Sequence, residues 1–537
     1  MSKHAPLPTP VELGFPPKFR EWYGEQVEAI DRCVFNDRRF TALAMPTGAG
    51  KSPVGVATAL LHPDVRRALY LTSTKGLQDQ LEQDFNPVGL FDLRGARNYP
   101  CEALEFRYGR QPGCDEGPCH SGVTCPLAPD RKQLGIRPDC QYYGRVFDAR
   151  RRTLVSTNFA MYFAGEEYAE GLGQFDLLII DEAHEADKEL EAFLTLEITS
   201  EETRNIGSQF LGSVRVEDWR DWATFYKQTL AMKVEQQEAF PPSTYEGQRE
   251  TRRLKAILAK LKRLSVVLPV DWIADIGEGV AKFAPMKIAA YAEQHLFRGI
   301  PHVVLMSATL TRKTTQLLGI RPTDLEFWEC PSRFPVLHRP VISVNTSPTV
   351  RVDARMSDDT KYMWMRRIDR LIDARRPLGW KGIIHTVSYV RMRELLTASE
   401  HRDIMITHDT AGTREAIRIF KQSAGPCLLV SPSIVTGYDF PDDECRYSII
   451  GKVPLPDMRG AIMKARGEFD KEYSGYLAMQ KLVQACGRAV RNPYDWCETL
   501  IVDDHFLWFI RKYRKHAPRW FLDAIEYVEC FPEPLEV

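Results

Sequence analysis

The stretch AMPTGAGKSPV, residues 44–54, has the glycine, lysine and serine spacing of a loop that binds phosphate. Gly48 and Gly50 would let consecutive backbone amides approach phosphate groups, and the N-terminus of a following helix would add positive potential. In such a loop Lys51 reaches the β- and γ-phosphates of a nucleotide and Ser52 ligates Mg²⁺. Taken alone, GAGKS also fits an ordinary turn. The phosphate-loop interpretation therefore demands an acidic magnesium site and an arginine elsewhere in the chain.

An acidic pair follows a run of apolar residues in QFDLLIIDEAH, residues 174–184. Because Asp181 comes directly after LLII, we expect a buried strand to deliver it to the carboxyl edge of a parallel sheet, where ligands bind. There Asp181 could hold Mg²⁺ through water, and Glu182 could orient and deprotonate an attacking water. Acids in such places more often cap a helix, but the upstream loop favours the catalytic interpretation.

The stretch QACGRAVR, residues 484–491, meets the demand for arginine. On a helix, Gln484, Gly487, Arg488 and Arg491 would share one face. Two arginines on that face could stabilise charge that develops on the γ-phosphate, although an exposed basic face is the usual explanation for such a motif alone. The three stretches together predict ATP hydrolysis, with these catalytic residues: Lys51, Asp181, Glu182, Gln484, Arg488 and Arg491.

Five of the twelve cysteines crowd into forty residues: Cys101, Cys114, Cys119, Cys125 and Cys140. The N-terminal stretch lacks the apolar core of a signal peptide, which disfavours a disulfide framework and favours a metal site. Four thiolates brought to one point can hold an iron–sulfur cluster or a zinc ion, and the sequence leaves both open. His120 is a further candidate zinc ligand, although exposure is its commoner fate.

The composition is that of an ordinary globular protein, and it limits the classes of function. The net charge is −1, so any site for a polyanion has to be a local basic channel. No run of about 18 apolar residues predicts a membrane span, and we expect a cytoplasmic protein without a membrane partner.

The elements that must position these residues alternate as strand and helix. Residues 40–85 predict strand, loop, helix, strand and helix, which is typical of a parallel α/β sheet. Residues 95–142 break this pattern with glycine, proline and cysteine, and residues 188–297 are mostly helical and charged. A second α/β half follows, with strands near 379–388, 403–409, 426–434, 447–456 and 499–506.

In this order, PTGAGKS, DEAH, MSATL and QACGRAVR resemble motifs I, II, III and VI of a superfamily two helicase. FREWYGEQ resembles the adenine-reading motif, with Arg20 and Gln26 at the matching positions. VTGYDFPDD resembles motif V, with Gly437 and Asp439 at the matching positions. The block from NYPC (98–101) to CQYY (140–143), followed by VSTNFAMYF and an inserted helical segment, is similar to the XPD/DinG family of iron–sulfur DNA helicases.

The resemblance implies an α/β fold of two RecA-like parallel-sheet domains, with an inserted Cys-rich iron–sulfur domain and an inserted helical arch domain. The implied boundaries are 1–95, 143–187 and 298–340 for the first RecA-like domain, 96–142 for the iron–sulfur domain, 188–297 for the arch and 341–537 for the second RecA-like domain. Met45 stands where the usual loop has a small residue, so it could crowd the loop while leaving the amide cradle intact. SAT replaces the SGT of close XPD relatives.

The resemblance also implies ligands. ATP would be bound by these residues: Arg20, Gln26, Pro46, Thr47, Gly48, Ala49, Gly50, Lys51, Ser52, His184, Gly437 and Asp439. Ser52 and Asp181 would hold Mg²⁺. Cys101 and Cys140 match the first and last ligands of a [4Fe–4S] cluster, Cys119 and Cys125 are the chosen middle pair, and Cys114 is the reserve.

The implied function is an ATP-dependent helicase, a monomer that moves 5′→3′ on single-stranded DNA and unwinds forked DNA. The alternative is a nucleic-acid-stimulated ATPase that remodels protein–nucleic acid complexes without separating strands.

Overall fold

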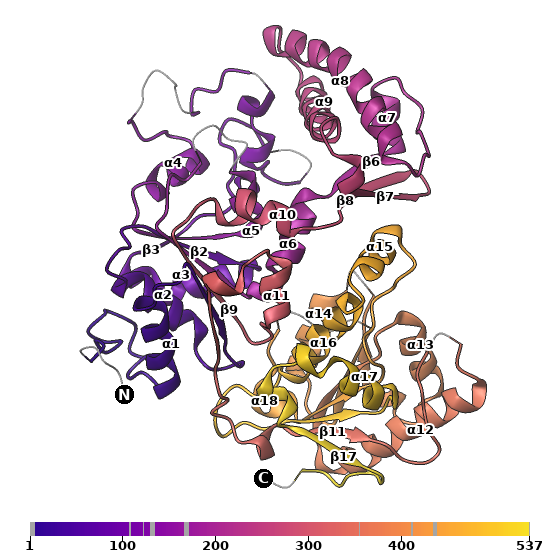
Figure 1. Ribbon diagram of the computed structural model, residues 1–537. Helices are drawn as coiled ribbons and strands as arrows, with labels where there is room; N and C mark the ends of the chain where they lie inside the picture. The colour runs from indigo at the N-terminus through magenta and orange to yellow at the C-terminus, as the bar shows by residue number, and fades with distance from the viewer. Residues whose placement is uncertain are drawn as a thin grey trace.

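The structure is a computed structural model of the 537-residue chain, and it describes residues 6–106, 109–121, 123–128, 135–165, 171–353, 355–409, 412–432 and 438–535. The chain forms two α/β halves with a third, smaller body above them (Figure 1). Among the described residues no helix is both long and apolar enough to cross a membrane.

The first half is built on a seven-stranded sheet in which every described pairing is parallel. Its strands, in spatial order, are β10 (Leu325–Glu329), β1 (Phe40–Ala44), β9 (His302–Ser307), β5 (Leu177–Asp181), β2 (Ala68–Thr72), β4 (Leu154–Asn158) and β3 (Leu90–Asp92). Ala42 and Leu43 enter different core clusters, so helices cover both faces, as an all-parallel sheet requires. Because β1, β9 and β5 are neighbours, the loops that follow them meet at one edge.

Helices of the first half follow the strands much as the sequence predicts. They are α1 (Gly24–Val34), α2 (Lys51–Leu61), α3 (Lys75–Phe85), α4 (Gln141–Ala149), α5 (Phe159–Ala164), α6 (Ala186–Leu194), α10 (Ala289–Ala292) and α11 (Arg312–Leu317). Helix α1 begins only at Gly24. Tyr23 is extended, and its amide donates to the Gln26 side chain in a capping box, which fixes the start of α1.

The second half repeats the plan with another seven-stranded parallel sheet. Its strands, in spatial order, are β13 (Met405–Thr407), β14 (Cys427–Ser431), β12 (Lys381–His385), β15 (Tyr447–Ile450), β16 (Glu498–Ile501), β11 (Val341–Val344) and β17 (Ile525–Val528). Its helices are α12 (Asp358–Arg375), α13 (Tyr389–Ala398), α14 (Thr413–Gln422), α15 (Ala461–Phe469), α16 (Tyr473–Cys486), α17 (His505–Tyr513) and α18 (Arg519–Leu522). The two parallel sheets confirm the predicted fold class.

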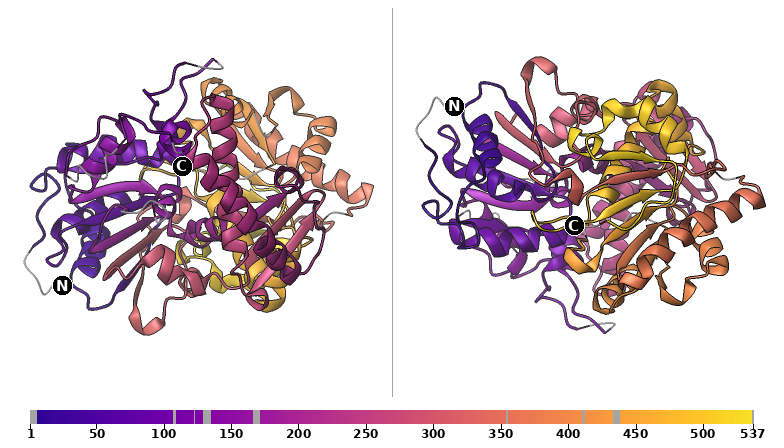
Figure 2. Two further views of the ribbon diagram at one scale, coloured as in Figure 1. Left: turned by 90° about the horizontal axis from the view of Figure 1, so that it is seen from above. Right: turned by 90° about the horizontal axis from the view of Figure 1, so that it is seen from below.

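The segment between β5 and β9 projects away from the sheets (Figures 1 and 2). It contains α7 (Ser200–Asn205) and the long helices α8 (Val216–Ala239) and α9 (Tyr245–Leu264), which pack on each other. At its root lies a three-stranded antiparallel sheet that the sequence pattern does not predict, made of β6 (Leu196–Thr199), β8 (Val280–Pro285) and β7 (Trp272–Gly277). These strands are short, and the turn between β7 and β8 relies on Gly279 with its positive φ of 72°.

The cysteine-rich segment leaves the first sheet after β3 and returns to it at α4 and β4. Its described part contains only short 3₁₀ turns and one isolated bridge between Pro100 and Gly113. This matches the absence of periodicity in the sequence.

Candidate functional site

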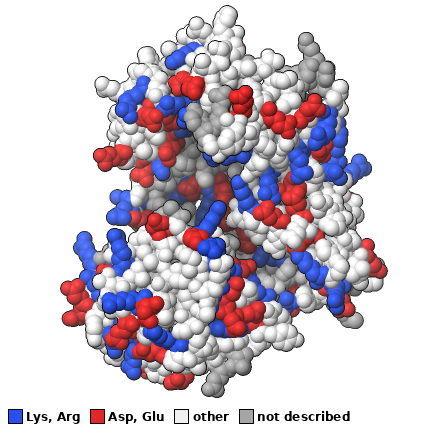
Figure 3. Space-filling view, turned by 180° about the vertical axis from the view of Figure 1, so that it is seen from behind, with Lys and Arg blue, Asp and Glu red and all other residues white. Residues whose placement is uncertain are grey.

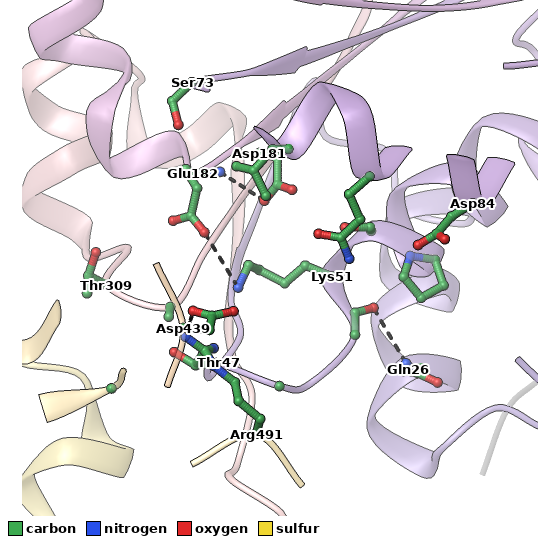
Figure 4. A pocket seen from close by; sticks show the side chains of 18 of the residues that line it. Gln26, Thr47, Lys51, Ser73, Asp84, Asp181, Glu182, Thr309, Asp439 and Arg491 are labelled. Carbon is green, nitrogen blue, oxygen red and sulfur yellow. Dashed lines mark hydrogen bonds and ion pairs between the residues drawn. The ribbon is translucent and has the colours of Figure 1, made fainter. Parts of the chain in front are cut away.

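A cleft of about 1170 Å³ lies between the two halves. It is lined by fourteen of the predicted site residues: Arg20, Gln26, Thr47, Gly48, Gly50, Lys51, Ser52, Asp181, Glu182, His184, Asp439, Gln484, Arg488 and Arg491. Figure 4 shows Lys51, Asp181, Glu182, Asp439 and Arg491 converging on one space. Pro46 and Ala49 belong to the same loop without lining the cleft, and Gly437 lies outside the described residues.

The loop between β1 and α2 has the backbone of an anion cradle. Gly48 and Gly50 have φ values of 75° and 76°, the left-handed region that favours glycine, and α2 begins directly afterwards at Lys51. The Gln26 amide donates to the Ala49 carbonyl (3.2 Å), and a Cβ at Gly50 would collide with that amide. Met45 does not crowd the loop, because its side chain is buried in the core beneath.

The acidic pair stands at the carboxyl end of β5. The Asp181 carboxylate accepts hydrogen bonds from the Tyr70 hydroxyl (3.1 Å) and the Glu182 amide (2.9 Å). Glu182 has a φ of 50°, a strained conformation for a residue with a side chain, and its carboxylate lies 3.9 Å from the Lys51 ammonium. With the backbone in this left-handed conformation, the Glu182 carboxylate points into the cleft (Figure 4).

The surroundings shift the pKa values of Asp181 and Glu182 in opposite directions. Burial, with the neighbouring Glu182 charge, raises the pKa of Asp181 to about 6. Burial also opposes the charged form of Glu182, but Lys51, His184 and Arg488 outweigh it and hold the pKa of Glu182 well below its ordinary value. Glu182 therefore stays ionised far below neutral pH, whereas Asp181 takes up a proton as the pH falls through about 6.

His184 connects this edge to the second half. Its Nδ1 lies 2.7 Å from the Ser307 hydroxyl at the end of β9, and its Nε2 lies 2.9 Å from Glu185. The Gln484 amide of α16 contacts the same Nε2. Burial opposes protonation, yet hydrogen bonds to Glu182 and Glu185 raise the pKa of His184 above its ordinary value.

The arginines reach the cleft from a loop and not from the predicted helical face. Helix α16 ends at Cys486, where Gly487 closes it, so Arg488 and Arg491 lie beyond its end. Arg491 pairs with Asp439, and burial lowers the pKa of Arg488 although Glu182 and Asp439 oppose that shift. The residues come together as predicted, but the i, i+4 spacing is not what brings them.

The five clustered cysteines line one small cavity, together with Tyr143. Burial first, and then the thiolates of Cys125, Cys101 and Cys140, raise the pKa of Cys119 to about 11. The Cys114 thiol donates to the Pro100 carbonyl (3.3 Å), and its sulfur lies 4.0 Å from that of Cys140.

A single zinc ion would draw its sulfur ligands to within about 4 Å of one another, given Zn–S bonds of ~2.3 Å. Among the described residues, no three of these thiols lie within 4.8 Å of each other. At least some of these thiols would therefore have to move closer together to bind one zinc ion.

Helix α6 contains a buried acid without a partner. Asp187 is 1% exposed, and within the described part of the chain neither carboxylate oxygen has a hydrogen-bond partner. Burial, more than the charges of Glu185 and Glu191, raises its pKa to about 6 from an ordinary 3.8. The folded state therefore favours the protonated form.

Replacing Asp187 with Asn should stabilise the protein above neutral pH. With the raised pKa, the contribution of Asp187 to stability is full below about pH 4 and lost as the pH rises through 6. The shift corresponds to about 3 kcal/mol at pH 8, an upper bound for the gain. Thermal unfolding at pH 8 should show a higher Tm for Asp187→Asn, with the difference vanishing near pH 4. A lower Tm at pH 8 would contradict this account.

Arg333 and Trp520 are among the cleft residues that the sequence predictions did not name. Arg333 lies in the connection between β10 and β11, and Trp520, on α18, donates its indole N–H to the Ala308 carbonyl (3.1 Å). Neither belongs to a periodic pattern, so their place depends on how the two halves pack.

Two family models match the chain. One, described as a helicase C-terminal domain, matches residues 380–524, and the other, described as the res subunit of type III restriction enzymes, matches residues 19–215. Together they cover both halves of the cleft.

The fold resembles solved XPD structures. A structure of XPD helicase aligns over 94% of this chain and 99% of its own, with a TM-score of 0.61 and 16% identity. Xpd4 of S. tokodaii aligns over 94% and 100%, with a TM-score of 0.55 and 13% identity. These likenesses show the fold, which includes two RecA-like halves.

Curated relatives match shorter stretches. A Fanconi anemia group J protein homolog from Gallus gallus is 26% identical over 132 residues, which is 22% of this chain and 10% of the relative. The probable ATP-dependent helicase of Methanocaldococcus jannaschii is 23% identical over 209 residues, 34% of this chain and 31% of the relative. The alignments thus span less than a third of either relative. The chain thus contains a region that matches a helicase C-terminal domain, and its fold is similar to that of solved XPD helicases.

Proposed function

We propose that this protein is an ATP-dependent DNA helicase that moves 5′→3′ along single-stranded DNA and separates the duplex ahead of it. The observation that carries the proposal is the cleft, in which Lys51, Asp181 and Glu182 from one half face Gln484 and Arg488 from the other. Hydrolysis then requires the two halves to close on the nucleotide. Each cycle of ATP turnover would therefore move one half relative to the other.

Each group has a role that its surroundings support. The amides of residues 46–52 and Lys51 would hold the phosphates, and Ser52 with Asp181 would hold Mg²⁺. Glu182, ionised at neutral pH, is the general base for the attacking water. Arg488 and Arg491 would stabilise the charge that develops on the γ-phosphate.

His184 and Gln484 would couple the two halves. Because Gln484 contacts the His184 imidazole, which lies beside Glu182, a shift of α16 would reach the general base through His184. Arg20 and Gln26 would stand on the adenine side of the cleft, and Asp439 would position Arg491.

The cysteine cavity suits a [4Fe–4S] cluster held by Cys101, Cys119, Cys125 and Cys140. All five clustered thiols line this cavity, and Cys119 and Cys125 stay the chosen middle pair with Cys114 as the reserve. When bound, such a cluster would supply much of the folding free energy of a segment that has little core of its own.

The arch touches this segment. The Tyr245 hydroxyl at the start of α9 donates to Glu116 (2.7 Å), and the Lys255 ammonium donates to the His120 carbonyl (3.3 Å). In our proposal the single strand passes beneath this contact, and the duplex parts beside the cysteine segment. The domain boundaries and the monomeric state remain those predicted from the sequence.

The mixed charges of the surface favour a confined path for DNA over a broad basic face. Figure 3 shows lysine and arginine interspersed with aspartate and glutamate over the rear face, as the net charge of −1 leads one to expect. Binding would then come from specific phosphate contacts and weaken with salt.

Forked duplexes with a 5′ or a 3′ single-stranded tail test this function. Strand release and ATP turnover should be measured in the same reaction, with a matched RNA fork in parallel. We expect ATP-dependent release from the DNA fork with the 5′ tail. ATP turnover that is stimulated by DNA without strand release would favour a remodelling ATPase, and release from the 3′ tail alone would overturn the polarity.

A further inference from the structure

The connection between the two halves reaches into the cleft. Residues 330–340 join β10 of the first sheet to β11 of the second, and Arg333 in this connection lines the same cleft as the phosphate loop. No motif in the sequence singles it out.

Arg333 bridges two parts of the first half. Its guanidinium carbon lies 3.9 Å from the centroid of the Tyr23 ring, and its Nη2 donates to the Gly48 carbonyl of the phosphate loop (3.2 Å). The ring of the neighbouring Phe334 packs against Gly48. A Cβ added to Gly48 would come within 2.6 Å of that ring. The connection is thus seated on the start of the loop.

The hydrogen-bonding capacity of Arg333 is only partly used. Its Nε and Nη1 are shielded from solvent, and within the described part of the chain neither has an acceptor. An N–H group shielded without an acceptor is costly, so a ligand that brings one nearby gains free energy.

The position identifies the part of a nucleotide that Arg333 would meet. Figure 4 shows Gln26 on the side of the loop away from Asp181 and Glu182, where the phosphate chemistry takes place. Tyr23 and Arg333 belong to that far side, since Tyr23 precedes Gln26 by three residues. A nucleotide whose phosphates lie at Lys51 would therefore place its base towards them.

We infer that Arg333 forms a wall of the nucleobase subsite, stacked between the Tyr23 ring and the base of the bound nucleotide. A guanidinium is planar and stacks on π-systems, while its edge donates to ring nitrogens or carbonyls. The base would thereby contact the connection between the two halves. This linker would then respond directly to nucleotide binding. This inference rests on the proposed function, because it assumes that the cleft binds a nucleotide.

Binding of ADP and of inorganic pyrophosphate, both with Mg²⁺, separates base contacts from phosphate contacts. By calorimetry, Arg333→Ala should weaken ADP binding about tenfold, in the range of a stacked cation or base. Arg333→Lys keeps the charge but loses the planar face, so it should weaken ADP binding similarly and leave pyrophosphate binding unchanged. Arg321→Ala, which removes an exposed arginine outside the cleft, is the control and should bind both ligands as the wild type does.

Three outcomes would overturn the inference. Unchanged ADP binding in both Arg333 variants would remove Arg333 from the subsite. Equal loss of ADP and pyrophosphate in Arg333→Lys, with Tm unchanged, would make it a phosphate ligand. Failure of the wild type to bind either ligand would overturn the proposed function and this inference with it.

Discussion

Replacing Glu182 with Gln should reduce ATP turnover at least a hundredfold while leaving ATP binding nearly intact. The substitution keeps the shape of the side chain and removes the base, and general-base catalysis is worth about 10²–10⁴-fold. Lys51, His184 and Arg488 keep the Glu182 carboxylate charged, and it lies at the cleft beside Lys51, so the base is available at neutral pH. Steady-state phosphate release in the presence of single-stranded DNA measures the effect.

Glu28→Gln is the matched control for this prediction. Glu28 is a half-exposed residue of α1 that pairs with Arg32 outside the cleft, so its loss should not change turnover. Since the substitution at Glu182 adds no bulk, nucleotide affinity should stay within a few-fold of the wild type. Unchanged turnover in Glu182→Gln would remove Glu182 from the mechanism.

Loss of a cluster ligand should remove the iron altogether. Single Cys→Ser changes at 101, 119, 125 and 140 should each turn a brown protein with about four irons per chain into a colourless one, because a [4Fe–4S] cluster needs four thiolates. Cys114→Ser should keep the colour, since that thiol donates to Pro100 beside the group. Iron content and visible absorption of protein purified without oxygen report both results.

The five variants together test the ligand choice. Iron lost in Cys114→Ser and kept in Cys119→Ser or Cys125→Ser would exchange the middle ligands. A colourless wild type that contains zinc would withdraw the iron–sulfur assignment and leave the ATP site untouched.

Local rules explain why much of the site could be predicted. The phosphate loop follows from two glycines and the lysine at the start of α2, and Asp181 follows from an apolar strand that must end at the ligand edge of a parallel sheet. Order along the chain was enough to associate these with Arg488, although the helix that was expected to present it ends at Cys486.

The remainder depends on packing between distant segments. Trp520 enters the cleft because the two halves face each other, and Arg333 enters it because the connection lies against the phosphate loop; no short pattern around either residue encodes these contacts. The sheet at the root of the arch escaped prediction for a related reason. Its strands are four to six residues long, and β6 is separated in sequence from β7 and β8 by the two long helices. Periodicity within one segment does not predict pairing between such distant strands.

The forked-duplex assay with wild type and Glu182→Gln tests the central claim most directly, because it asks whether chemistry in this cleft drives strand separation. The account predicts ATP-dependent release of the strand from the fork with the 5′ tail by the wild type, and none by Glu182→Gln, although both bind the fork equally. Release by both proteins at equal rates, or ATP turnover by the wild type with the fork left intact, would contradict it.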